Sequence, residues 1–179
     1  SRLDIRHEAA SPSTKSLFLC DHNSPLVTES EPDVFHKIVS KLLYVGLQAR
    51  ADILMTMSFL TSRVSCTTRQ DMIKLKRLLE YVKGTMSLFL TLGADCLSTM
   101  QTFVDAAYGV HPDCRSQTGG TISLGTGGIV NRASKQKINT KSSTEAELVG
   151  ASDYLANTIW TQNFMRAQGY PIADSYFEQ

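Results

Sequence analysis

Two acidic residues stand where the surrounding sequence is apolar, and together they indicate metal chemistry. Asp105 ends the β-prone run Thr102-Phe103-Val104, and Glu147 lies near the start of a long helical pattern that follows Lys141. Carboxylates at the end of a strand and on the inward side of a following helix are the oxygen ligands that hold divalent ions in metal-dependent nucleases. Asp105 and Glu147 are therefore the candidate catalytic and metal-binding residues.

The helix that carries Glu147 is expected to turn this residue toward the core. Glu147 is the first member of a series at four-residue spacing that continues with Ala151, Leu155 and Ile159. Because a carboxylate on an inward stripe needs a cation or hydrogen bonds to offset its desolvation, a metal ion would explain its position. For Asp105, the ordinary alternative is a turn residue that ends a strand.

Helix capping offers an ordinary role for Glu147 as well. Thr144-x-x-Glu147 fits a capping box, in which the acid stabilises the start of a helix without any catalytic role. Ser142-x-x-Glu145 fits the same motif in a different register. The pattern alone leaves the two registers and the metal site open.

Composition excludes a strong whole-chain attraction to nucleic acid. The 179 residues include 18 basic and 17 acidic side chains, so that any basic surface must be local. A hydrophobic content of 42% is ample for one domain of ordinary size or two small ones. The four cysteines lack zinc-site spacing and fit reduced thiols of an intracellular protein, cytoplasmic or nuclear. No apolar run is long enough for a membrane span, and the start without Met is typical of a processed or partial chain.

The N-terminal half is predicted to be helical. Residues 1–32 show no sustained period and are interpreted as a lead-in segment, extended or partly disordered. Residues 33–84 contain three amphipathic patterns, with start or stop signals at Asp33, Asp52, Thr68 and Gly84. The third pattern carries a basic cluster that suits either a phosphate backbone or a solvated helix face, formed by Lys74, Lys76, Arg77 and Lys83.

The C-terminal half has the pattern of strands and one long helix, so the predicted fold class is α+β. Strand patterns occupy residues 87–92, 100–105, 119–124, 129–132 and 136–141, and a further strand begins at residue 175. A helix is expected from Lys141 to Gly169. The glycine-rich turn at residues 125–128 predicts a hairpin, because it lies between two strands and lacks the Gly-Lys-Ser/Thr of a phosphate-binding loop.

Several linked motifs resemble a known family. They are, in order, Val104-Asp105-Ala106-Ala107-Tyr108, Asp113-x-Arg115-Ser116-x-Thr118-Gly119, Ser134-Lys135-Gln136-Lys137 and Ser142-Ser143-Thr144-Glu145-Ala146-Glu147. Their order and spacing resemble the ribonuclease H domain of copia-type retrotransposon polyproteins. Upstream, Arg50-Ala51-Asp52-Ile53 and Leu75-x-Arg77-Leu78-Leu79-x-Tyr81-Val82-Lys83-Gly84-Thr85 resemble the segment that follows the polymerase palm. The resemblance covers residues 33–179.

The resemblance implies a helical thumb-like or connection-like segment at residues 33–92 and an incomplete ribonuclease H-like mixed sheet with one long helix at residues 93–179. It makes Asp105 the first-strand acid and Glu147 the helix acid of a site for Mg²⁺ or Mn²⁺. The implied reaction is hydrolysis of the RNA strand of an RNA–DNA hybrid. Four basic residues would line the hybrid backbone or protect an edge strand: Arg132, Lys135, Lys137 and Lys141.

Parts of the family pattern have no counterpart in this chain. The family's third and fourth acids are missing, because the sequence ends at Gln179, where the third acid is expected, and neither Asp153 nor Asp174 is suitably placed. We therefore expect weak metal binding and impaired cleavage. The Tyr-x-Asp-Asp element of a polymerase is also missing, so DNA synthesis by these residues is not expected.

Two other functions remain open. The chain could be a non-catalytic remnant that acts as a structural or interaction subunit, because an incomplete sheet exposes an edge and an apolar helix face to a partner or a second copy. It could also bind nucleic acid without cleavage through the basic cluster near Lys74, with a steep salt dependence.

Overall fold

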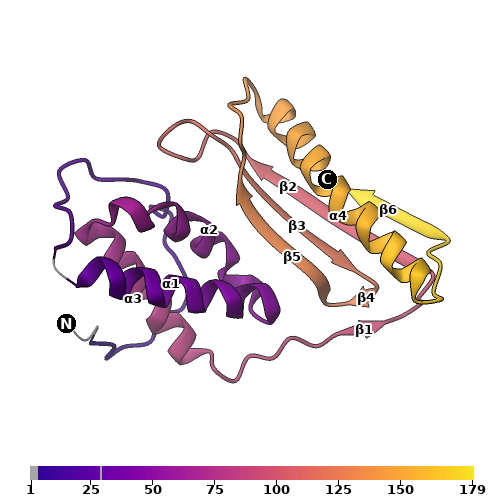
Figure 1. Ribbon diagram of the computed structural model, residues 1–179, viewed down its shortest axis with the longest axis horizontal. Helices are drawn as coiled ribbons and strands as arrows, with labels where there is room; N and C mark the ends of the chain where they lie inside the picture. Colours follow the sequence, from indigo (N-terminus) through magenta and orange to yellow (C-terminus); the bar gives the residue numbers. More distant parts are fainter. Residues whose placement is uncertain (1–3, 29) are drawn as a thin grey trace. The chain divides into compact units, whose positions relative to one another are not determined.

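The computed structural model describes residues 4–28 and 30–179, and the chain divides into two compact units at Phe89 and Leu90. The first unit is helical. The second unit holds a mixed sheet and one long helix (Figure 1). The predicted α+β class is therefore confirmed. The part of the predicted lead-in segment at residues 1–3 and 29 lies outside the described residues.

Three helices form the first unit, as their hydrophobic periods predict. They are α1 (Glu31–Gln48), α2 (Leu54–Ser62) and α3 (Arg69–Gly84), with 3-10 turns η1 (Ala51–Ile53) and η2 (Val64–Cys66) between them. Their apolar faces meet in a core that includes Phe35, Met57 and Leu75. Leu17 and Val27 also belong to this core, so that the segment before α1 contributes to the packing.

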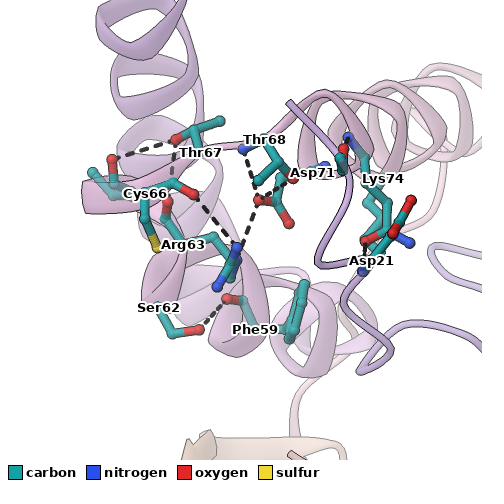
Figure 2. A network of polar contacts seen from close by, with 12 residues as sticks. Asp21, Phe59, Ser62, Arg63, Cys66, Thr67, Thr68, Asp71 and Lys74 are labelled. Atoms are coloured by element: carbon teal, nitrogen blue, oxygen red, sulfur yellow. Dashed lines mark hydrogen bonds and ion pairs between the residues drawn. The ribbon is translucent and has the colours of Figure 1, made fainter. Parts of the chain in front are cut away.

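The start of α3 is fixed by a buried polar network (Figure 2). The Thr68 hydroxyl accepts a hydrogen bond from the Asp71 backbone N–H, and the Asp71 carboxylate accepts one from the Thr68 N–H at 2.9 Å. Arg63 Nε lies 3.2 Å from the same carboxylate. This reciprocal capping box confirms Thr68 as the start signal.

The segment around Arg50 ties helix ends together. The buried Arg50 guanidinium donates to both carboxylate oxygens of Asp52 and to the carbonyl oxygen of Thr85 at 3.0 Å. The Tyr81 hydroxyl donates to the same Asp52 carboxylate at 2.8 Å. A partly buried bidentate pair of this kind holds the end of α1 and the end of α3 in place.

The second unit is a four-stranded sheet in the order β5-β3-β2-β6. Its strands are β2 (Thr99–Ala107), β3 (Gln117–Ser123), β5 (Gly128–Lys135) and β6 (Asp174–Glu178). The first three are antiparallel, and β6 pairs in parallel with β2. A separate short ladder joins β1 (Gly93–Ala94) to β4 (Gly125–Thr126), and β4 lies in the predicted glycine-rich turn between β3 and β5.

Two predicted strands are wrong. Residues 87–92 form no strand, because their alternating apolar residues find no paired strand and their side chains, including Leu88 and Phe89, stay exposed. Residues 136–141 also leave the sheet. The Gln136 amide turns inward and donates to Thr118 Oγ1 at 2.9 Å and to the Ala146 carbonyl at 2.8 Å. The last strand before α4 therefore ends at Lys135, one residue before Gln136.

One long helix, α4 (Ser143–Ala167), crosses one face of the sheet (Figure 1). Its inward stripe differs from the predicted series of Glu147, Ala151, Leu155 and Ile159. The buried residues are Ala146, Gly150, Tyr154, Thr158, Thr161 and Met165. A strict four-residue series rotates by about 40° at each step, so Leu155 and Ile159 have turned out of the interface.

Tyr154 fills the space between α4 and β3. Its ring covers Gly120, and its hydroxyl donates to the Val130 carbonyl at 3.1 Å. Burial raises the pKa of Tyr154 to about 12, although the positive charge of Arg132 acts in the opposite direction. The neutral phenol is thus favoured by folding.

The pKa of Tyr154 predicts a loss of stability at alkaline pH. Above about pH 10 an unfolded tyrosine releases its proton while folded Tyr154 keeps it, so its contribution is complete below pH 10 and falls toward pH 12. Urea unfolding between neutral pH and about pH 11 should show a steeper fall in unfolding free energy for the wild type than for Tyr154→Phe. Parallel pH profiles for the two proteins would contradict this assignment.

Candidate functional site

Asp105 projects from the face of the sheet opposite α4. In β2 the side chains of Val104 and Ala106 are buried, whereas those of Phe103 and Asp105 are exposed, in strand alternation. Asp105 Oδ1 accepts a hydrogen bond from the Ala106 N–H at 2.9 Å, which orients the carboxylate. Asp105 is therefore a strand residue with an accessible carboxylate.

A cavity of about 350 Å³ lies beside Asp105. It is lined by Phe103, Val104, Asp105, Gly119, Gly120, Thr121, Glu178 and Gln179. Gly119 is the register partner of Asp105, and a Cβ added there would meet no atom within 4 Å. The absence of a side chain opposite Asp105 keeps this side of the cavity open.

Glu178 adds a second carboxylate to this cavity. The parallel pairing of β6 with β2 puts Glu178 in register with Phe103, so that its side chain shares the exposed face with Asp105. Glu178 is not among the predicted site residues, because its position depends on which strand β6 pairs with and in which direction. Its alternation with Tyr176 was the only available signal.

The capping question at the start of α4 is settled in favour of Ser142. The Ser142 hydroxyl accepts a hydrogen bond from the Glu145 N–H at 3.2 Å, and the Glu145 carboxylate accepts one from the Lys141 N–H at 2.6 Å. The alternative box with Thr144 is wrong. Glu147 is consequently free of any capping role.

Glu147 carries a buried oxygen atom that lacks a hydrogen-bond partner. Its Oε2 is shielded from solvent, although the residue as a whole is half-buried. An unsatisfied carboxylate oxygen is costly to bury, and a cation would offset that cost. The Glu147 carbonyl accepts a hydrogen bond from Gln179 Nε2 at 2.9 Å, and Gln179 also lines the Asp105 cavity. The structure nevertheless places the two predicted acids on opposite faces of the sheet, Asp105 on the open face and Glu147 on the helix that covers the other face.

These donors suit one hydrated ion better than two. Mg²⁺ keeps several water ligands and takes one or two protein carboxylates, which Asp105 and Glu178 on one face of the sheet are able to supply, whereas Glu147 of α4 lies on the opposite face. Two ions need more carboxylates. Among residues 4–28 and 30–179, no three His, Cys, Asp or Glu side chains gather as a set that could hold a metal ion.

The basic cluster on α3 contacts the segment that precedes α1. Lys74 Nζ donates to the Leu19 carbonyl at 2.6 Å, Arg77 Nη2 to Ser11 Oγ at 3.1 Å and Lys83 Nζ to the Ile5 carbonyl at 3.4 Å. Lys76 is 3.9 Å from Glu80. Partial burial lowers the pKa of Lys74, whose ammonium lies 4.4 Å from the centroid of the Phe59 ring.

The basic residues near β5 do not form one row. Arg132 and Lys135 are three residues apart in a strand, so their side chains leave opposite faces. Lys135 Nζ is 2.6 Å from the Asp113 carboxylate, whereas Lys137 and Lys141 are exposed on the following loop.

No helix in the described part of the chain is long and apolar enough to span a membrane.

Comparison with known proteins gives one relative. An uncharacterized mitochondrial protein of Arabidopsis thaliana is 33% identical over 142 residues, which are 78% of this chain and 59% of that protein. The chain therefore covers about three fifths of the relative's length. No protein-family model and no solved structure matches the chain.

Proposed function

We propose that this chain is a fragment of a copia-type retrotransposon polyprotein, comprising the end of the reverse transcriptase region and part of a ribonuclease H domain. The motif order around Asp105 and Glu147 supports the origin. The identity to the plant mitochondrial protein is compatible with it but adds only weak support. The observation that carries the proposed activity is the cavity that Asp105 and Glu178 share, where two carboxylates on one face of the sheet are available to a divalent ion.

The proposed reaction is hydrolysis of RNA in an RNA–DNA hybrid. A bound Mg²⁺ or Mn²⁺ ion would supply Lewis-acid activation of the attacking water. Asp105 would hold the ion with the oxygen that its bond to the Ala106 N–H leaves free, and Glu178, which lines the same cavity, would contribute a second carboxylate. The open side of the cavity beside Gly119 would admit the backbone of the hybrid, which is recognised by shape and phosphates.

Cleavage of a labelled RNA–DNA hybrid with magnesium or manganese tests this proposal. We expect weak cleavage by the 179-residue chain and its loss in Asp105→Asn, because the neutral amide is a poorer ligand for a hard cation. The matched control is Asp153→Asn, which makes the same change at an exposed position of α4 and should keep the activity. Equal cleavage by the wild type and Asp105→Asn would contradict the assignment, and so would no cleavage by a folded chain.

A second candidate is a structural or interaction subunit without catalysis. The observation that favours it is the set of large apolar side chains exposed on α4, which are Leu148, Leu155, Ile159, Trp160 and Phe164. The edge strands β5 and β6 also offer unpaired backbone groups to a partner. Sedimentation separates the two candidates. A stable self-assembly that persists in Asp105→Asn, together with no cleavage by the wild type, would favour this second function.

A further inference from the structure

A second cavity lies on the other face of the same sheet. It has a volume of about 380 Å³ and is lined by Val130 and Arg132 of β5 and by Ala156, Asn157, Trp160 and Thr161 of α4. Arg132 is in register with Gly120, the glycine that the Tyr154 ring of α4 covers. Asp105 pairs with Gly119 on the opposite face. The two cavities are therefore separated by the sheet.

Trp160 gives this cavity a flat aromatic wall. Its side chain is 63% exposed, and its ring stacks on Phe164 with centroids 5.4 Å apart and an interplanar angle of 10°. Phe164 covers one face of the indole, which is still largely exposed and lines the cavity. An indole presented in this way is a stacking platform for a planar heterocycle such as a nucleobase.

Arg132 gives the same cavity an uncommitted positive charge. Within residues 4–28 and 30–179 it has no ion pair and no hydrogen bond, whereas Lys135 of the same strand is paired with Asp113. Arg132 lines this cavity together with residues of α4. A guanidinium is suited to bidentate recognition of a phosphate group.

The two other polar residues of the cavity differ in whether the side chain makes a hydrogen bond within the helix. The Thr161 hydroxyl donates to the Asn157 carbonyl at 2.8 Å, so that its proton is committed to the helix. Asn157 also lines the cavity, and an asparagine side chain has both a donor and an acceptor. The cavity therefore combines an aromatic face, a cation and an amide, within the size range of small-molecule sites.

From this combination we infer that the cavity between β5 and α4 binds a nucleoside phosphate, with its base on Trp160, its phosphate on Arg132 and its base edge within reach of Asn157. The nucleoside phosphate is either a free nucleotide or one unit of a single-stranded nucleic acid. This site needs no metal ion and does not depend on cleavage at Asp105.

Fluorescence of the protein tests the inference directly, because Trp160 is the only tryptophan of the chain. The full chain is titrated in a chelating buffer with adenosine monophosphate, adenosine, inorganic phosphate and a short single-stranded oligodeoxyadenylate. We expect saturable quenching by adenosine monophosphate or by the oligonucleotide, and weaker quenching by adenosine. Arg132→Gln should raise the dissociation constant of the phosphorylated ligand about tenfold, with little effect on adenosine.

The matched control is Arg166→Gln, the same change at an exposed arginine of α4 that does not line the cavity. Binding by the oligonucleotide alone identifies a strand as the source, and binding by the mononucleotide identifies a free nucleotide. Calorimetry with Trp160→Leu supplies a second readout, in which binding should be lost while the unfolding transition is retained. The inference is overturned if no probe binds, or if Arg132→Gln and Arg166→Gln weaken binding equally.

Discussion

Gly120→Ala should destabilise the second unit by about 3 kcal/mol, although it adds a single methyl group. A Cβ at this position would lie 2.5 Å from Cε2 and 2.8 Å from Cζ of the Tyr154 ring. The ring is held between α4 and the sheet, with 3% of the residue exposed, so it has little room to move. Accommodation would shift α4 or break the Tyr154 bond to the Val130 carbonyl. Both outcomes reduce stability.

Gly119→Ala is the matched control for this prediction. It makes the same change one residue earlier in β3, where the added methyl group would meet no atom within 4 Å. It should leave stability within about 0.5 kcal/mol of the wild type or raise it slightly, because glycine is entropically unfavourable in a strand. Urea unfolding followed by Trp160 fluorescence reports on this unit. Similar midpoints for the two variants would contradict the packing argument.

Asp71→Ala should destabilise the first unit by about 3 kcal/mol. The Asp71 side chain is 1% exposed, and its Oδ2 accepts hydrogen bonds from the Thr68 N–H, the Thr68 hydroxyl and Arg63 Nε. Alanine would leave a buried backbone donor unsatisfied and an arginine without its partner (Figure 2). The start of α3 would lose both halves of its capping box.

Asp71→Asn measures the contribution of the negative charge to stability separately from that of the capping hydrogen bonds. Its side-chain oxygen is able to keep the Thr68 bonds while the negative charge opposite Arg63 is lost, so we expect a smaller loss, about 1 to 2 kcal/mol. Hydrogen exchange of the first α3 amides measures both effects, because the capped end of the helix should exchange faster as the cap weakens. If Asp71→Ala exchanges like the wild type, the network does not stabilise the helix start.

Local signals account for the successful sequence predictions. Thr68 and Asp71 are three residues apart, and Ser142 and Glu145 have the same spacing, so both caps lie within one helical turn and are readable from the sequence. The helix periods of the first unit are equally local. The α+β class follows from the same short-range patterns, whereas the parallel pairing of β6 with β2 does not.

Long-range packing accounts for the failures. The strand predicted at residues 87–92 needed a pairing partner that does not exist in the second unit's sheet, whose order is β5-β3-β2-β6. The buried stripe of α4 is set by the residues that fit against the sheet, with Gly150 beside Thr118 and Tyr154 over Gly120. The cavity between Arg132 and Trp160 joins residues distant in sequence, and no local pattern connects them.

The parallel pairing of β2 with β6 also sets the order in which the second unit folds. Thr99 pairs with Asp174, so β3, β5 and α4 all intervene between the two partners. Contacts so distant in sequence slow folding, because closing the long loop costs conformational entropy before the contacts form and offset that cost. During synthesis β2 emerges long before β6 and can pair with β3 first. We therefore expect the wall of the Asp105 cavity that β6 supplies to form last, after the rest of the sheet is in place.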